Sequence, residues 1–136
     1  MRGSEIVPLG RPVRRGEVFW VEFSPVRGRE IDEFHPALVV QNDLGNRFSE
    51  TTVVVAMTHT VPDKPYPFVV IVEPEDCGLR DRGVVNCSQV ATAQQAGASS
   101  RLRPPKGEKQ VRPIGRLAPE KMAEVDLALR YNLDLG

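Results

Sequence analysis

Three short segments rich in β-branched and aromatic side chains, all between residues 15 and 58, constrain the fold more than any other feature of the chain. They are residues 16–24, 37–41 and 51–57. The first alternates in part between two faces, and the other two are nearly continuous apolar runs; both patterns are typical of strands. We therefore predict three strands that hold a polar loop, residues 25–35, and the threonine that follows the third strand, Thr58.

The chain after residue 60 repeats the pattern more sparsely. Residues 68–72 and 83–90 are further β-branched runs, and residues 111–117 predict a short final strand. Asn42 and Asp43, after the second run, favour a turn or a single helical turn. Twelve prolines and eleven glycines, many of them between these runs, indicate numerous turns.

Only the last segment has helical spacing. Pro119 suits the first position of a helix, where its missing N–H is harmless, although Ala118 before it is a poor N-cap. The predicted buried stripe is Met122, Val125, Leu129 and Leu133. Five or six short strands with one C-terminal helix predict a mainly β (α+β) domain, folded as a small, strongly curved barrel.

A chain of 136 residues is expected to form one domain. We assign residues 15–136 to this domain and predict a flexible N-terminal arm over residues 1–14, which lack periodicity. Residues 93–110 are rich in small and polar residues and predict a mobile basic loop. The first four residues resemble an expression-vector leader and could equally be native.

The charge distribution is more informative than the net charge, which is zero. Residues 101–116 hold six basic residues against a single acidic one, Glu108. This window is either a solvated loop or an electrostatic footprint for a phosphate backbone.

The two cysteines, Cys77 and Cys87, match no metal-binding spacing, and Cys87 is expected to be a buried free thiol. The sequence has neither an apolar stretch long enough to span a membrane nor a secretory signal. A reducing cytoplasm is therefore the expected location.

The loop between the first two strands is unusually dense in charge. Its charged or titratable residues are Arg27, Arg29, Glu30, Asp32, Glu33 and His35. Loops held by rigid strands commonly carry functional sites, but such a run can also be a solvated face.

Several blocks, in order, resemble the MazF/PemK (Kid) family of toxin endoribonucleases. The blocks are Arg15-Gly16-Glu17-Val18-Phe19-Trp20-Val21, Pro25-Val26-Arg27-Gly28-Arg29-Glu30, His35-Pro36-Ala37-Leu38-Val39-Val40-Gln41-Asn42-Asp43, Leu44-Gly45-Asn46-Arg47-Phe48-Ser49, Ala56-Met57-Thr58, Gly83-Val84-Val85, Gln89-Val90 and Ile114-Gly115-Arg116-Leu117-Ala118-Pro119-Glu120-Lys121-Met122. The resemblance spans about residues 14–133. It implies an SH3-like barrel with a C-terminal helix, in agreement with the pattern of strands.

The resemblance also implies an activity: cleavage of single-stranded RNA, such as mRNA, without a metal ion or other cofactor. The 2′-hydroxyl attacks the adjacent phosphate and leaves 2′,3′-cyclic phosphate and 5′-hydroxyl ends. This reaction needs a base, an acid and donors for the phosphorane charge. Family members are homodimers with RNA in a groove at the dimer interface, and a disordered segment of a MazE-like antitoxin covers that groove.

Site residues follow from the aligned blocks. Thr58 falls on the active-site threonine, although by chemistry alone it is an ordinary strand-end hydroxyl. With His35 and Arg29 it forms the expected catalytic set, in which Arg29 could also be a solvated loop charge. The residues expected to bind RNA or to order the loop are Glu17, Arg27, Gly28, Glu30, Ser88, Gln89 and Thr92.

The chain departs from the family at several charged positions. His35 stands where an arginine is usual, and a histidine, unlike arginine, can exchange a proton near neutral pH. We therefore hypothesise that His35 is a general acid or base; the alternative is a loop histidine without a role. Asn86, Ser88 and Ala91 replace charged residues of some relatives, so the site could be weakened or read another RNA sequence.

Two other functions stay open on the sequence. The barrel could bind RNA or an antitoxin-like partner without cutting, or be an interaction domain that uses the basic window as its contact. Trp20 is expected in the core rather than as a platform for a base.

Overall fold

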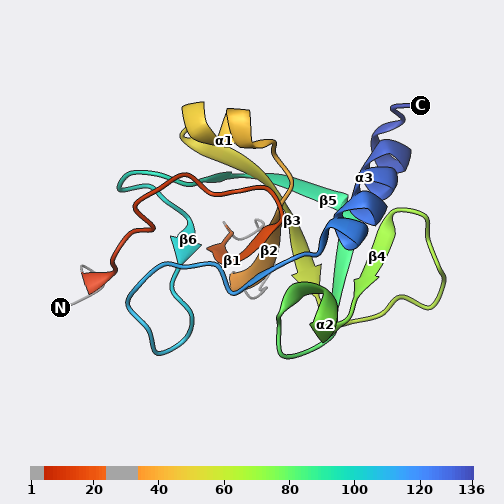
Figure 1. Ribbon diagram of the computed structural model, residues 1–136, viewed down its shortest axis with the longest axis horizontal. Helices are drawn as coiled ribbons and strands as arrows, with labels where there is room; N and C mark the ends of the chain where they lie inside the picture. Colours follow the sequence, from red (N-terminus) through yellow and green to blue (C-terminus); the bar gives the residue numbers. More distant parts are fainter. Residues whose placement is uncertain (1–4, 24–33) are drawn as a thin grey trace, which may run out of the picture.

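The computed structural model describes residues 5–23 and 34–136 as a single curled sheet with a C-terminal helix (Figure 1). The strands are β1 (Glu17–Glu22), β2 (Phe34–Val39), β3 (Thr51–Thr58), β4 (Val69–Val72), β5 (Gly83–Gln94), β6 (Leu102–Arg103) and β7 (Gly115–Arg116). The helices are α1 (Asp43–Phe48), α2 (Pro74–Cys77) and α3 (Pro119–Leu133). The strand order is β4-β5-β3-β2-β1-β6, β7 pairs with β1, and neighbours are antiparallel. The predicted mainly β, strongly curved fold is confirmed.

Strand β5 is the longest and pairs with two neighbours. Its first part pairs with β4 and with the end of β3, and its second part pairs with the start of β3. Between the rungs Met57–Val85 and Val55–Val90, β3 contributes one residue and β5 contributes residues 86–89. This bulge bends β5 and increases the local twist, which helps to curl the sheet.

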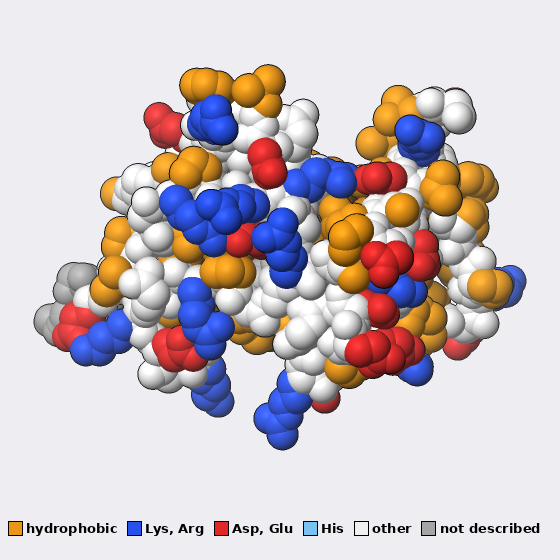
Figure 2. All heavy atoms as spheres, in the orientation of Figure 1, with side chains coloured by type: hydrophobic (Ala, Val, Ile, Leu, Met, Phe, Trp, Pro, Cys, Tyr) orange, Lys and Arg blue, Asp and Glu red, His pale blue; other side chains and the backbone are white. Residues whose placement is uncertain are grey.

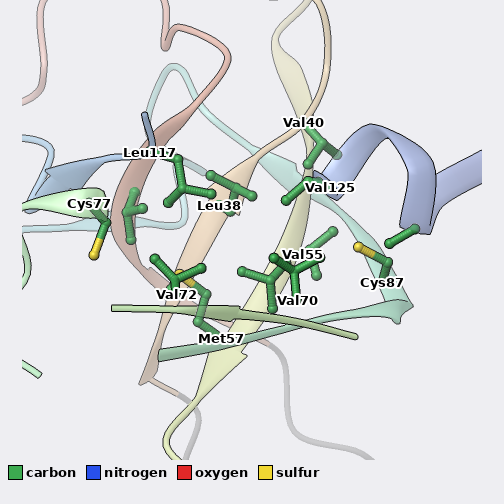
Figure 3. Close-up of a cluster of buried hydrophobic side chains, with 13 residues drawn as sticks. Leu38, Val40, Val55, Met57, Val70, Val72, Cys77, Cys87, Leu117 and Val125 are labelled. Atoms are coloured by element: carbon green, nitrogen blue, oxygen red, sulfur yellow. The ribbon is translucent and has the colours of Figure 1, made fainter. Parts of the chain in front are cut away.

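Two apolar clusters lie on opposite faces of the sheet, because side chains alternate along each strand. The first contains Leu38, Val55 and Val125, so that it joins the strands to α3 (Figure 3). The second contains Val39 and Val54 from the neighbouring positions of the same strands. Trp20 is half-buried and belongs to neither cluster, which differs from the core position expected for it.

Helix α3 begins as predicted, with Pro119 in its first turn and no side-chain cap from Ala118. Val125 and Ala128 are buried, and Met122 and Leu129 pack against the first cluster. The expectation that Leu133 is buried is wrong, since its side chain is 51% exposed. The helix packs against β4 and β5, and its last turn runs past them (Figure 1).

Residues 5–14, predicted to form a flexible N-terminal arm, pack against the sheet. Val13 is 1% exposed within the second cluster, and Leu9 packs against that cluster. Val7 forms a parallel bridge with Gln110. The prolines and arginines of this segment obscured its apolar anchors, which form no periodic pattern because the segment is neither a strand nor a helix.

The loop predicted over residues 93–110 is only partly a loop. Residues 93–94 complete β5, and Leu102 and Arg103 form β6 against Val21 and Trp20 of β1. Leu102 is buried in the second cluster, and Arg103 adds an ion pair to Glu22 of β1, so both residues anchor the short strand. The final strand predicted over 111–117 is limited to the two residues of β7. The predicted helical turn after Asn42 is confirmed as α1, which the Asn42 side chain caps.

Candidate functional site

Two of the three residues expected to be catalytic lie at the same end of neighbouring strands. The last described rung between β2 and β3 joins Ala37 to Ala56. His35 and Thr58 each stand two residues beyond this rung, in the direction of the same sheet end. Because strand side chains alternate with a period of two, both also share the face of Ala37 and Ala56. The third residue, Arg29, and its neighbours Arg27, Gly28 and Glu30 lie outside the described residues.

Thr58 ends β3 and is exposed. Its Oγ1 accepts a hydrogen bond of 3.2 Å from the backbone N–H of Thr60, which orders the turn that follows. A hydroxyl has one proton to donate as well as lone pairs to accept with. Thr58 can therefore donate to a phosphate oxygen while it keeps the turn in place.

His35 is half-buried in β2, where it pairs with Val21 of β1. Its ring lies 6.0 Å from the ring of Phe23, between centroids, at a tilt of 57°. This contact restricts the imidazole on one side, and the sheet end leaves it partly accessible.

His59 is a site residue that the sequence reasoning missed. It is exposed, follows Thr58 directly, and its Nδ1 lies 3.1 Å from the carbonyl oxygen of Arg82. The available signal was its position: it is one of only two histidines in the chain and stands beside the threonine of the aligned block.

Ser88 and Gln89 lie in the bulge of β5 and are exposed. The backbone N–H and Oγ of Ser88 both donate to Oδ1 of Asn86, at 3.0 and 2.6 Å. Thr92, also exposed, forms a rung with Val53, five residues before Thr58. At about 3.4 Å per residue this rung is about 17 Å from Thr58, so within one chain Thr92 is not part of the Thr58 cluster.

Glu17 lies at the opposite end of the sheet from Thr58. Its side chain is buried, and its oxygens accept from Arg11 at 2.7 and 3.1 Å and from the backbone N–H of Arg14 at 2.8 Å. These bonds tie the segment before β1 to the sheet. An RNA-binding or loop-ordering role for Glu17 stays a prediction, and the bonds that the structure gives it all go to this N-terminal segment.

At least three of the six basic residues in the window 101–116 are paired with acidic groups. Ion pairs join Arg103 to Glu22, Lys109 to Glu5 and Arg112 to Glu108, at 2.9, 2.6 and 2.8 Å. The hydrogen bonds from Arg112 lower the pKa of Glu108. Figure 2 shows basic side chains gathered over the half of the molecule that holds β1 and β6, and acidic ones over the region of α2. The window is thus less available to an anionic ligand than its composition suggests.

A groove of about 800 Å³ runs between the N-terminal segment, α1 and the connection from β5 to β6. Leu9, Phe48 and Val111 contribute apolar surface to it, and Arg11 and Arg47 contribute charge. The groove lies beside Glu50, just before the start of β3, whereas Thr58 ends the same strand. The groove and the Thr58 cluster are therefore separate features.

Cys77 and Cys87 are buried and free, as expected for Cys87. Burial raises the pKa of the Cys87 thiol to about 11, and burial is also the main cause of the raised pKa of Cys77. Within residues 5–23 and 34–136, no three His, Cys, Asp or Glu side chains group as a metal site. Among the helices that the structure describes, none is long and apolar enough to cross a membrane.

The chain is similar in sequence to two endoribonucleases. The chain is 34% identical over 127 residues to Endoribonuclease MazF9 of Mycobacterium tuberculosis, covering 90% of this chain and 98% of the relative. It is 32% identical over 123 residues to Endoribonuclease EndoA of Bacillus subtilis, covering 90% and 96%.

Solved structures share the fold. An endoribonuclease from a mycobacterial species, in complex with its cognate antitoxin, matches with a TM-score of 0.67 and 24% identity, over 91% of this chain and 97% of that one. The MazE-MazF structure (Form-II) from Deinococcus radiodurans also matches with a TM-score of 0.67, at 22% identity and the same coverage. Residues 14–133 match the family model for PemK-like, MazF-like toxins of type II toxin-antitoxin systems. The chain belongs to this family.

Proposed function

We propose that the protein is a toxin endoribonuclease that cleaves single-stranded RNA in the cytoplasm and is inhibited by a cognate antitoxin. The observation that carries this proposal is the placement of His35 and Thr58 on the same face at one end of the sheet, where Thr58 is exposed. The names of MazF9 and EndoA, both endoribonucleases, and the antitoxin complex of the mycobacterial relative support it.

The proposed reaction is attack of the ribose 2′-hydroxyl on the neighbouring phosphate, without a metal ion. In this reaction Thr58 donates to a phosphate oxygen on which negative charge develops, and such a donor contributes about 10²–10³ in rate. His35 exchanges a proton with one of the reacting oxygens. Arg29 adds positive charge, and Ser88, Gln89 and Thr92 contact the RNA from β5.

We further propose that the protein acts as a homodimer. Large apolar side chains on the outer side of α3 support this arrangement, because Leu127 and Tyr131 are 64% and 63% exposed and stand one helical turn apart. Leu135, just beyond the end of the helix, is 66% exposed. A second copy would cover this surface and bring two sets of site residues into one particle.

The test is incubation of the pure protein with a long RNA of mixed sequence in EDTA. We expect fragments with 5′-hydroxyl and 2′,3′-cyclic phosphate ends, lost in Thr58→Ala and kept in Thr51→Ala, a control at the other end of β3. Addition of the antitoxin encoded beside the gene should stop cleavage. Fragments that appear only with added metal ions would contradict the proposed chemistry.

A second function has its own observation. Asn86 and Ser88, where some relatives have charged residues, bond to each other in the β5 bulge. A site with fewer charges could bind RNA or an antitoxin-like partner without efficient cleavage. Intact RNA in EDTA, together with binding that weakens as salt rises, would favour this function.

A further inference from the structure

Both histidines of the chain lie at the same end of the sheet. Continuing the β2–β3 register from Ala37–Ala56 sets His35 opposite Thr58. Opposed residues on antiparallel strands have Cα atoms about 4.5–5.5 Å apart. His59 is the next residue after Thr58, so both imidazoles belong to the sheet end that carries Thr58.

The structure fixes which nitrogen of His59 can exchange a proton. Nδ1 lies 3.1 Å from the backbone carbonyl oxygen of Arg82. A carbonyl oxygen only accepts hydrogen bonds, so Nδ1 carries a proton in the neutral and in the charged ring alike. With Nδ1 donating to this carbonyl, the neutral ring presents Nε2 as its acceptor atom.

Two contacts hold the His59 ring in position without burying it. The β3–β5 ladder ends at Thr58–Val84, and the bond from His59 to Arg82 continues the connection between the two strands beyond this rung. On the other side, the bond from the Thr60 N–H to Thr58 Oγ1 orders the turn that carries His59. Since His59 is exposed, its ring remains accessible to a ligand.

We propose that His59 is the general base of RNA cleavage and that His35 is the general acid. This inference rests on the proposed function. Nε2 of His59 takes the proton of the 2′-hydroxyl while the 2′-oxygen forms its bond to phosphorus. The bond from phosphorus to the 5′-oxygen breaks, and this oxygen takes a proton from the His35 imidazolium. The products are a 2′,3′-cyclic phosphate and a 5′-hydroxyl, and solvent restores the two imidazoles.

Two segments connected to His59, one through its bond to Arg82 and the other along the chain, carry charged groups. Before β5 they are Arg80, Asp81 and Arg82, of which Arg82 is paired with Glu73 of the β4–α2 junction at 2.9 Å. The connection after β3 adds Asp63 and Lys64. Among the described residues of β2, the titratable group is His35. His59 would add a second proton-transfer group beside Thr58. The site would then hold two such groups, with His35 standing at the position of the usual arginine.

The first test uses His59→Asn, because an asparagine side chain keeps an N–H donor for the Arg82 carbonyl but cannot titrate. We expect kcat to fall about 10²–10⁴-fold, and the acidic limb of the profile of kcat/KM against pH to disappear. Lys64→Gln, a change of charge in the same connection, should leave rate and profile as in wild type. If His59→Asn is as active as wild type while His59→Ala is impaired, the role is structural and the inference is overturned.

The second test separates base from acid with an RNA whose 5′-bridging oxygen at the scissile bond is replaced by sulfur. A thiolate leaves without protonation, so the defect of His35→Ala should shrink about tenfold or more. The defect of His59→Asn should stay, since the 2′-hydroxyl must still lose its proton. Recovery of His59→Asn instead would overturn the assignment. A wild-type protein that cleaves no RNA would refute the proposed function itself, a result distinct from either outcome.

Discussion

The two ends of strand β3 carry the same kind of side chain and use it in opposite ways. At one end, which we term the anchored end, Thr52 is fully buried and its hydroxyl donates to Asn46 Oδ1 at 2.7 Å. At the other, the open end, Thr58 is exposed beside His59. A polar group that is buried and bonded stabilises the fold, whereas one that is exposed on a rigid strand is available to a ligand.

The anchored end contains a connected set of polar groups. Gln95 accepts from the N–H of Val13 and donates to the carbonyls of Asn46 and Ser49, each at 2.9 Å. Glu17 binds Arg11 at the same end. Among the described residues, every buried side-chain nitrogen and oxygen has a hydrogen-bond partner. The buried groups of this end therefore have little left with which to bind RNA, and their substitution should change stability rather than rate.

The largest expected effect tests the open end. Thr58→Ala should lower kcat about 10²–10³-fold, equivalent to about 3–4 kcal/mol of activation free energy, because a donor to the developing charge is lost. Single-turnover RNA cleavage measures the rate, and thermal unfolding should show a midpoint within about 2 °C of wild type. A large loss of stability would show that Thr58 stabilises the fold as the groups of the anchored end do, and would contradict the distinction between the two ends.

The next effect tests the anchored end through Glu17→Gln. Loss of one partner from a pair that is largely buried should cost about 2 kcal/mol, less than for a fully buried pair because the Arg11 side chain is 32% exposed. Urea unfolding measures this change. Cleavage well below the unfolding midpoint should stay within about threefold of wild type.

Glu22→Gln is the matched control for that change. Its pair with Arg103 leaves both side chains 26% exposed, so we expect less than about 1 kcal/mol. A Glu17→Gln protein that folds stably but cleaves RNA slowly would show that the anchored end also serves the reaction.

A smaller effect compares neighbouring threonines within β3. Thr52→Val should cost about 1–2 kcal/mol, since Asn46 Oδ1 loses one of its donors and the hydroxyl is replaced by a methyl group. Thr51→Val removes an exposed hydroxyl bonded to Ser49 and should change stability by less than about 0.5 kcal/mol. Equal losses of unfolding free energy in Thr52→Val and Thr51→Val would show that burial does not determine how much each hydroxyl contributes to stability.

The smallest effect lies outside both ends. Ala118→Ser adds the missing N-cap of α3 and should raise the free energy of unfolding by about 1 kcal/mol. Ala123→Ser, on an exposed position of the same helix, should lower it by a few tenths of a kcal/mol. Neither should alter the cleavage rate, so a parallel change in rate would mean that global stability, and not the open end alone, limits catalysis.

The sequence predicted the parts of the fold that depend on local pattern. The β-branched runs became β1 to β5, and Pro119 marked the start of α3. The anchoring of residues 5–14 and the strand β6 could not be predicted, because both rest on contacts with distant segments, such as those of Val13 and Leu102, that form only in the folded chain. Single contacts between distant segments leave no periodic pattern in a sequence.

The candidate site was predicted only where a local sequence pattern marked its residues. His35 and Thr58 were found through an aligned block, and the sheet register then placed them at one end. The buried environment of Glu17 was not foreseen, since its partner Arg11 lies in a segment without regular structure. Nor was His59, whose relevance depends on a bond to the backbone of Arg82, more than twenty residues away in the chain.

The bulge of β5 contains positions at which the sequence can vary without a change in the fold. Ser88 and Gln89 stand between rungs and take part in none of the described strand pairs, so their side chains can change without moving a neighbouring strand. Under the proposed function, exchange of these two residues would change the RNA preference while every rung of the ladder is kept. Ser88 and Gln89 are therefore suitable positions for redesign of binding, because they can be changed without redesign of the hydrophobic core.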